Sequence, residues 1–437
     1  MATTPSENPL TGFLRSLTNI ERNEWTAVLV SFLLVLVLMT SYSILKPVRD
    51  ALGADWGNVG LSITWTINFG LSLFAIALYG VALTYIRFRV MVPGVYVFFA
   101  LTFVALYFIR TQAPDPTLAN KGFYVWVSVF SLFNLSVFWS FMTDVFNKAQ
   151  ARRLFGVIAA GTTVGAILGP IITASLVDDL GANGLLLVSA ALLTVPMFAI
   201  PVLRNLKITQ LFNEELQADL SSQQSLGTNP FSGFSILFSD RYLLWICAFI
   251  LLYVTINTFV YFELQDLTRE YSLEFRAKIW SWIEITTNTL TLITAALITS
   301  RIVIKLGMQT ALAMIPGLVA LGIVALVAAP GLLVLGIFQI GRRVGNYAIT
   351  RPSREMLFTV LNRETRFKAK PVIDVVLYRG GDVLTAWLFT LLAGKLGLGL
   401  SGMAVVIGGI ALVWVFVAIR LGREYQDRTA ENLPNIA

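Results

Sequence analysis

The chain has 437 residues, of which 56% are hydrophobic and only 13% are charged. This number of charged residues is too small to cover the surface of soluble domains. The composition therefore predicts an integral membrane protein. The formal net charge of +7 does not indicate nucleic-acid binding, because the basic residues lie between apolar runs, as in cytoplasmic loops. Histidine is absent and Cys247 is the single cysteine, which excludes the usual general base, an internal disulfide framework and a cysteine metal cluster.

Apolar runs long enough to cross a bilayer recur along the whole chain. They predict twelve transmembrane helices, at 25–45, 61–85, 91–109, 123–146, 156–177, 184–203, 242–263, 279–300, 308–329, 332–351, 371–393 and 401–420. The fold class is therefore an all-α membrane protein with two six-helix bundles. A weak internal echo supports this division, because MVPGV at 91–95 and MIPGL at 314–318 fall at corresponding places of the two halves.

The predicted domain organisation has five parts. Residues 1–24 form a cytoplasmic amino-terminal segment, 25–203 the first bundle, 204–240 a polar cytoplasmic linker, 241–420 the second bundle and 421–437 a cytoplasmic tail. Lysine and arginine are concentrated in the segments that this topology places inside, above all in the block 351–370. Both termini are therefore expected in the cytoplasm.

Charged residues lie near the ends of several predicted spans. Lys46 and Arg49 lie at the outer end of the first span, where Pro47 is expected to end or kink the helix. The two cations share a helix face, so they either receive a solute from outside or extend to the outer surface. Asp144 and Glu263 lie close to helix ends and are interpreted as solvated or capping groups, with charge balance or coupling as the functional alternative.

Glycines recur at every fourth position in GVIAAGTTVGAILGP, residues 156–170. Gly161, Gly165 and Gly169, followed by Pro170, predict a face that packs closely against another helix. Together with Gly156, this pattern also resembles the fifth-helix motif of major facilitator superfamily antiporters, which implies transport by exchange.

The tenth and eleventh predicted spans carry charges deep in the hydrocarbon. Too few apolar residues precede Arg342 and Arg343 for a complete span, so the helix has to continue through them, and Arg342 lies about 15 Å from its start. Arg379 reaches a similar depth in the eleventh span, with Asp382 one turn later as a possible partner. Glu284, in the eighth span, is a candidate partner for one of the adjacent arginines.

Intramembrane charges of this kind normally face a wet cavity and mark a solute path. We therefore predict that the arginines of the tenth and eleventh spans hold a substrate at the midplane and that the two cations of the first span receive it. Glu284 and Asp382 then balance the charge of the empty site. Because guanidinium groups suit carboxylates and phosphates, the expected partner is an anionic small molecule. The alternative is that the charges only pair with one another and hold helices together.

Three further stretches resemble the ATP/ADP translocases, the nucleotide transporters of plastids and obligate intracellular bacteria. They are ILKPVRDAL at 44–52, FWSFMTDVFNKAQARRLFGVI at 138–158 and REMLFTVLNRETRFKAKPVIDVVLYRGGD at 354–382. The resemblance implies a major facilitator-like fold, a bacterial inner-membrane location and a phosphate-binding cation at Arg49. The chain departs from the family within 123–143, which lacks the family's acidic residue, and matches its seventh-helix acidic residue only loosely, at Glu263.

The sequence thus predicts a secondary active transporter that moves an organic anion, such as a nucleotide or another phosphorylated metabolite, by alternating-access exchange. No Walker-type phosphate loop is present, so ATP hydrolysis should not drive it. We expect a monomer among membrane lipids, with no enzyme activity, cofactor, metal or nucleic-acid partner. Two alternatives stay open: a proton-coupled symporter or exporter of a different solute, and a non-transporting sensor or assembly factor with the same fold.

Overall fold

The computed structural model describes residues 20–85, 88–211, 237–238, 240–361, 365, 369 and 372–432. Most of the predicted amino-terminal segment and linker, part of the basic block 351–370 and the end of the tail therefore lie outside the described residues. Helices make up the described ranges, without a strand among them, and seven helical segments there are long and apolar enough to cross a membrane. The chain is thus a multi-pass membrane protein, while the number of twelve spans remains a prediction.

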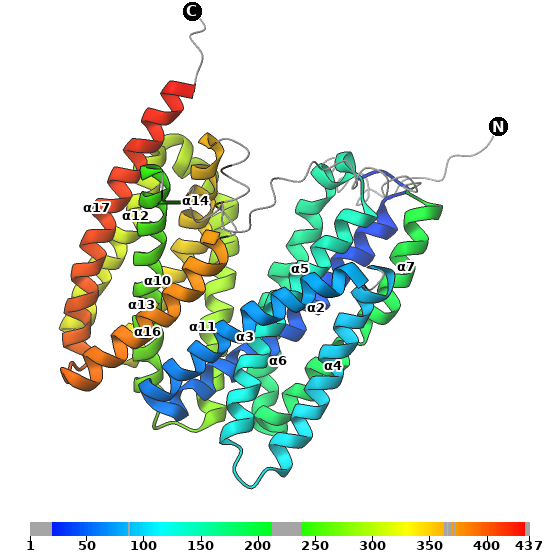
Figure 1. Cartoon of the computed structure of the whole chain (residues 1–437), viewed down its shortest axis with the longest axis horizontal. Coiled ribbons are helices and arrows are strands. Elements are labelled where there is room, and N and C mark those ends of the chain that lie inside the picture. Colours follow the sequence, from blue (N-terminus) through cyan, green and yellow to red (C-terminus); the bar gives the residue numbers. More distant parts are fainter. Residues whose placement is uncertain are drawn as a thin grey trace, which may run out of the picture. The chain divides into compact units, whose positions relative to one another are not determined.

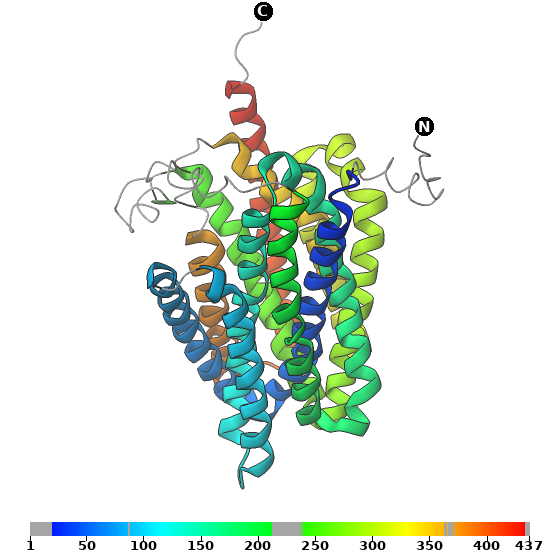
Figure 2. The same cartoon turned by 90° about the vertical axis from the view of Figure 1, so that its right-hand side faces the viewer.

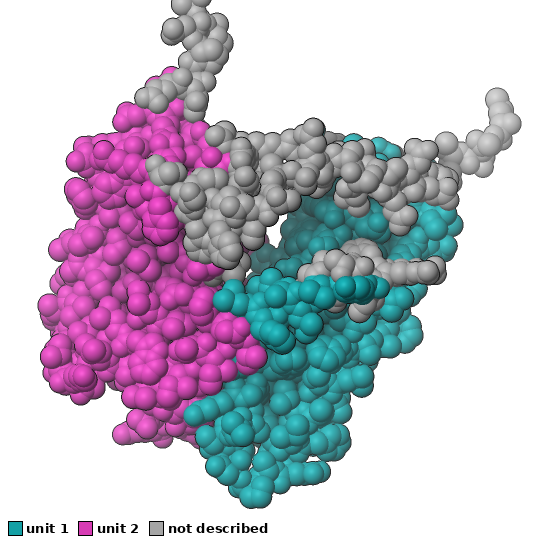
Figure 3. Space-filling model, in the orientation of Figure 1, with its two compact units in different colours: residues 1–49, 72–224 teal, residues 50–71, 225–437 magenta. Residues whose placement is uncertain are grey.

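Two compact units divide the chain (Figure 3). The first consists of residues 1–49 and 72–224, and the second of residues 50–71 and 225–437. The helical segments of the amino-terminal half are α2 (Trp25–Leu52), the 3₁₀ turn η1 (Gly53–Trp56), α3 (Gly57–Tyr85), α4 (Phe88–Gln112), α5 (Thr117–Val145), α6 (Lys148–Leu192) and α7 (Val195–Thr209) (Figure 1). Residues 50–71, at the end of α2 and the start of α3, thus group with the carboxy-terminal helices rather than with the rest of the predicted first bundle.

The glycine stripe of α6 makes a close helix contact within the first unit. A Cβ atom added at Gly165 would lie 2.5 Å from the carbonyl oxygen of Leu36, and one at Gly161 would lie 2.7 Å from that of Phe32. Gly169, one turn further on, faces the same helix. Because only glycine leaves room for this approach, the stripe brings the backbones of α6 and α2 together.

Two long helices change direction at glycines with positive φ. Gly181 in α6 has φ 66° and Gly307 in α12 (Ser300–Ala328) has φ 77°, a left-handed conformation that is costly for residues with a Cβ atom. Both glycines fall between two predicted spans, so the spans are separated by a bend rather than by a loop. In contrast, α2 does not end at Pro47 and continues to Leu52.

The carboxy-terminal half contains α10 (Arg241–Thr268), α11 (Leu273–Thr294), α12, α13 (Leu332–Gly345), α14 (Arg351–Leu357), the 3₁₀ turn η5 (Phe358–Val360), α16 (Tyr378–Lys395) and α17 (Leu400–Asn432). α17 lies along α12 and also contacts α10 (Figures 1 and 2). Trp414 of α17 is fully buried and packs against Phe249 of α10, with ring centroids 5.5 Å apart.

Three π-helical turns interrupt the helices of this half: η3 (Ala295–Thr299), η4 (Asn346–Thr350) and η6 (Val372–Leu377). Such turns are rare and frequently occur at functional sites. η4 directly follows the turn of α13 that carries Arg342 and Arg343, and η6 directly precedes Tyr378 and Arg379. The irregular backbone therefore borders both groups of charges that the sequence places inside the membrane.

Polar contacts hold residues 50–71 within the second unit. Arg276 Nη2 of α11 lies 2.6 Å from Asp55 Oδ1 of η1, and Asn58 Nδ2 of α3 donates a hydrogen bond to Asp266 Oδ2 of α10 at 3.0 Å. The Arg276 side chain is buried, whereas Asp55 is partly exposed. These contacts fix the end of α2, η1 and the start of α3 against α10 and α11.

Candidate substrate-binding site

Arg342 forms the centre of a polar cluster in the second unit. Its side chain is only 3% exposed, and its Nη2 donates to Asn257 Oδ1 of α10 at 2.8 Å and to Gln339 Oε1 at 2.5 Å. The guanidinium carbon lies 5.8 Å from the ring centroid of Tyr253. The other two nitrogens, Nε and Nη1, have no hydrogen-bond partner among the described residues. An unsatisfied buried donor costs about 1–3 kcal/mol, so a ligand that bonds to these nitrogens would stabilise the cluster.

The adjacent Arg343 is directed to a different partner. Its Nη1 lies 2.5 Å from Glu284 Oε1 of α11, and both side chains are buried. Consecutive residues of a helix point about 100° apart, so Arg342 and Arg343 face different neighbours. Glu284 therefore compensates the charge of Arg343, while the bonded neighbours of Arg342 in the described chain are uncharged.

Tyrosine and amide side chains surround the two arginines. Asn346 Nδ2 donates a hydrogen bond to the hydroxyl of Tyr253 at 2.9 Å. The rings of Tyr253 and Tyr378 pack edge to face, with their centroids 6.4 Å apart. The hydroxyl of Tyr378 also accepts a hydrogen bond from Arg354 Nη1. Tyr253, Tyr378 and Asn257 are only half-buried, so part of each of these polar side chains is accessible.

The uncharged members of this cluster are not among the residues predicted from the sequence. Tyrosines and amides inside apolar runs are also common packing residues, so residue type alone carries little information. Their spacing was the available signal. Tyr253 and Asn257 are four residues apart, Gln339 lies three residues before Arg342, and Asn346 lies four residues after it. Residues with such spacing share one face of a helix.

Arg379 and Asp382 lie in the first turns of α16, and both are half-buried. Asp382 Oδ1 accepts a hydrogen bond from Thr258 Oγ1 at 3.2 Å, which joins α16 to α10. Thr258 directly follows Asn257, so neighbouring residues of α10 contact both Arg342 and Asp382. The structure thus attaches the charges of two predicted spans to one stretch of α10.

The predicted cations of the first unit lie near the end of α2. Lys46 and Arg49 are both half-buried. Arg49 Nη1 donates to Ser128 Oγ of α5 at 3.4 Å, and its guanidinium carbon lies 5.5 Å from the ring centroid of Tyr124. Arg49 therefore contacts α5 within its own unit.

The remaining acidic candidates lie elsewhere. Asp144 Oδ1, near the end of α5, lies 3.0 Å from Lys207 Nζ of α7, an arrangement that suits a structural ion pair. Glu263 is buried in α10, two residues before Gln265, whose side chain donates to the carbonyl oxygen of Asp50 at 2.7 Å. No group of acidic or cysteine side chains among the described residues could hold a metal ion.

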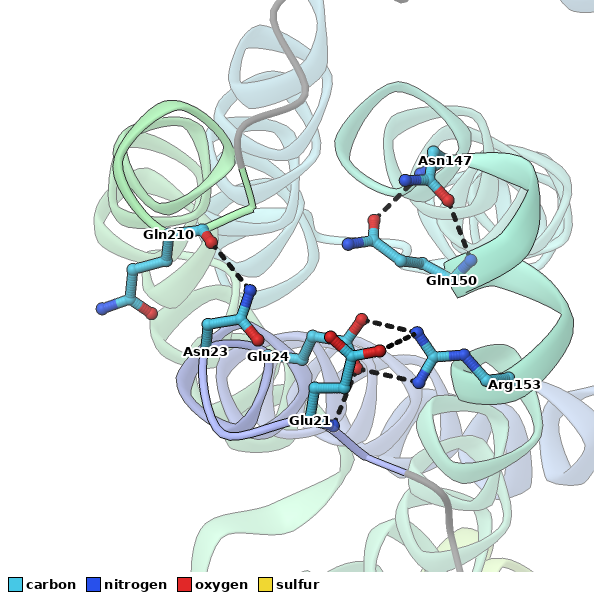
Figure 4. A network of polar contacts seen from close by, with 7 residues as sticks. All are labelled: Glu21, Asn23, Glu24, Asn147, Gln150, Arg153 and Gln210. Carbon is cyan, nitrogen blue, oxygen red and sulfur yellow. Dashed lines mark hydrogen bonds and ion pairs between the residues drawn. The ribbon is translucent and has the colours of Figure 1, made fainter.

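A second charged network lies at the helix ends of the first unit (Figure 4). Arg153 Nη2 of α6 lies 2.9 Å from Glu24 Oε1 and 3.3 Å from Glu21 Oε1, just before α2. Asn23 Nδ2 donates to the carbonyl oxygen of Gln210 at 3.1 Å, directly after α7. The network therefore ties the start of α2 to the start of α6 and to the end of α7.

Part of the chain matches a known transporter family. The family model of the TLC ATP/ADP transporter matches residues 272–425, the segment that contains Glu284, Arg342, Arg343, Arg379 and Asp382. None of the curated proteins matches the chain.

Solved structures of transporters share the fold along nearly the whole chain. A bacterial homologue of the iron transporter ferroportin has a TM-score of 0.65 at 13% identity and covers 91% of this chain and 99% of its own. The D-xylose-proton symporter has a TM-score of 0.62 at 12% identity, with 92% and 98% covered. The nucleoside transporter NupG has a TM-score of 0.58 at 15% identity, with 92% and 99% covered.

At such low identities these transporter structures establish the fold alone. The family match and these structures agree on transport rather than enzymatic catalysis. The chain therefore shares its fold with solved transporter structures, and its residues 272–425 match the family model of the TLC ATP/ADP transporter.

Proposed function

We propose that the protein exchanges organic phosphates, with nucleotides as the first candidates, across the bacterial inner membrane. The observation that carries this proposal is Arg342, a buried guanidinium with two nitrogens unbonded in the described chain. Guanidinium groups match the geometry and charge of phosphate oxygens. The TLC ATP/ADP transporter match over the same segment supports a nucleotide as the substrate.

The proposed roles follow from the surroundings of each charge. Arg342 and Arg379 contact the anion, and the pair of Arg343 with Glu284 borders the site. Lys46 and Arg49 receive the anion from the outer side. In this proposal the chain is a monomer with twelve spans and both termini in the cytoplasm, and its two six-helix bundles give alternating access.

Exchange is the mode that the observations favour. The chain contains no histidine that titrates near neutral pH, and a counter-substrate resets an exchanger without a proton. Proton-coupled transport is the second candidate, because Glu263 lies in α10, which is long and apolar enough to cross a membrane, and Asp382 lies in α16, within the eleventh predicted span. Such groups occur in the proton relays of transporters.

Uptake into proteoliposomes tests the proposal. Vesicles that contain purified protein are loaded with ADP, and the uptake of labelled ADP is compared with uptake into empty vesicles. Exchange predicts uptake that depends on internal ADP and is insensitive to an imposed pH gradient. Accumulation in empty vesicles under a pH gradient would replace exchange by proton coupling. If nucleotides and sugar phosphates are neither taken up nor raise the melting temperature, an organic phosphate is not the substrate.

A further inference from the structure

Two neighbouring arginines have acceptors of different charge. Glu284 presents a carboxylate to Arg343, whereas Asn257 and Gln339 present amide oxygens to Arg342. An amide oxygen accepts the same hydrogen bond as a carboxylate oxygen but carries no net charge. The fold thus compensates one guanidinium and leaves the adjacent one positive.

We infer that Asn257 and Gln339 are positioning residues, which orient Arg342 for an anion without neutralising it. Both amides bond to the same nitrogen, Nη2, from two helices: Gln339 from the preceding turn of α13 and Asn257 from α10. The guanidinium plane is therefore held by one nitrogen, and Nε and Nη1 keep their donors for the substrate. This inference rests on the proposed function, because it assigns the amides a role in the same site.

Packing alone does not explain the amides. Asparagine and aspartate have nearly the same shape, as do glutamine and glutamate, so carboxylates would fit the space that these amides occupy. A carboxylate would also relieve the cost of burying an uncompensated guanidinium. The chain therefore carries the less stabilising acceptor at both positions, and an anionic ligand supplies the missing charge.

The ring of Tyr253 fits this interpretation. It lies 5.8 Å from the guanidinium carbon of Arg342, and its hydroxyl is fixed by Asn346. An aromatic face attracts a cation without cancelling its charge. Arg342 thus receives orientation and partial stabilisation from three neutral side chains.

Asn257→Asp provides the test, because it changes charge at nearly constant shape. Binding of ADP and AMP to the purified protein is measured together with the melting temperature of the ligand-free protein. We expect ADP to bind about ten- to hundredfold more weakly, since a neutralised arginine loses a charged hydrogen bond to phosphate. The preference for ADP over AMP should shrink, and the ligand-free protein should melt at a higher temperature.

Two further variants separate charge from structure. Asn257→Ala removes the hydrogen bond without adding charge. It should weaken the binding of ADP and AMP by similar factors, both smaller than the effect of Asn257→Asp on ADP, and keep the preference for ADP. Asn205→Asp places the same new charge on the exposed surface of α7 and should leave binding unchanged. A merely structural role of Asn257 would not alter the preference between the two nucleotides.

The outcomes distinguish this inference from the proposed function. If Asn257→Asp binds ADP and AMP as the wild type does, the amides do not preserve the charge of Arg342, although the transporter proposal stands. If the wild type binds neither nucleotide nor inorganic pyrophosphate, the proposed substrate class fails. If Asn257→Asp does not fold, Gln339→Glu makes the same change of charge from α13. A reduced preference of this variant for ADP over AMP supports the inference, and an unchanged preference contradicts it.

Discussion

Arg153 and Arg342 show two different uses of a buried or partly buried arginine. Arg153 is 29% exposed at the start of α6 and reaches the carboxylates of Glu21 and Glu24 (Figure 4). Arg342 is 3% exposed inside α13, bonds to neutral oxygens and keeps two nitrogens without a partner in the described chain. A compensated arginine at a helix end stabilises the fold, whereas the uncompensated Arg342 is the residue that we propose to bind the anion.

The local structure around Arg153 supports its structural role. Asn147 caps α6 by accepting a hydrogen bond from the backbone of Gln150 at 2.9 Å, and the side chain of Gln150 accepts one from the backbone of Asn147 at 3.1 Å. This reciprocal cap satisfies amide groups that a helix start otherwise leaves unpaired. The charged network thus forms part of an arrangement that anchors helix ends.

The largest expected effect on stability concerns the buried ion pair. Glu284→Gln leaves Arg343 charged without a carboxylate to compensate it, so the free energy of unfolding should fall by about 3–5 kcal/mol. Thermal unfolding of the purified protein measures this loss. A loss comparable to that of the exposed variant Glu21→Gln would remove the distinction between the two networks.

Arg342→Gln should separate transport from stability. ADP exchange per folded molecule is expected to fall about ten- to hundredfold, because the charged hydrogen bonds to phosphate are lost. The free energy of unfolding should change less than in Glu284→Gln, since no acidic partner is left unpaired. Proteoliposome exchange and thermal unfolding are measured on the same preparation, and full exchange activity would contradict the assigned role.

Arg153→Gln should show the opposite pattern. It removes the partner of Glu24, which is only 1% exposed, so unfolding should become easier by about 1–2 kcal/mol. Exchange of ADP per folded molecule should stay at the wild-type level, because the network lies outside the binding cluster. A loss of exchange with unchanged stability would show that the helix-end network takes part in transport.

The smallest effect is expected at the rim of the helix-end network. Glu21 is 64% exposed, so Glu21→Gln should change the free energy of unfolding by no more than about 0.5 kcal/mol. Added salt should reduce this difference further, because exposed charges are screened. Unfolding at low and high salt provides the measurement, and a large effect that persists at high salt would contradict the surface assignment.

The length of the tenth span made its arginines detectable from the sequence. A helix that starts near residue 332 cannot cross the membrane without including Arg342 and Arg343, and α13 and η4 continue through them. The different partners of the two arginines were not predictable, because the sequence does not tell which side of the helix faces Glu284. The roles of Asn257 and Gln339 depend on the packing of α10 against α13, which no local pattern encodes.

Residues 50–71 illustrate a second limit. Hydrophobic periodicity correctly indicates helices there, but it does not reveal which helices a span packs against. Asp55 and Asn58 contact α11 and α10, far along the chain, and so this stretch groups with the second unit. The sequence assigned it to the first bundle by chain order alone.

This grouping makes the chain pass between the units inside two continuous helices. It leaves the first unit within α2 after Arg49 and returns to it within α3 after Leu71. Beside these passages, Pro47 lacks an amide hydrogen for the helix ladder, and a Cβ atom at Gly70 would meet nothing within 4 Å. Because each of these helices belongs to both units, a substitution beside either passage can disturb the packing of both units at once.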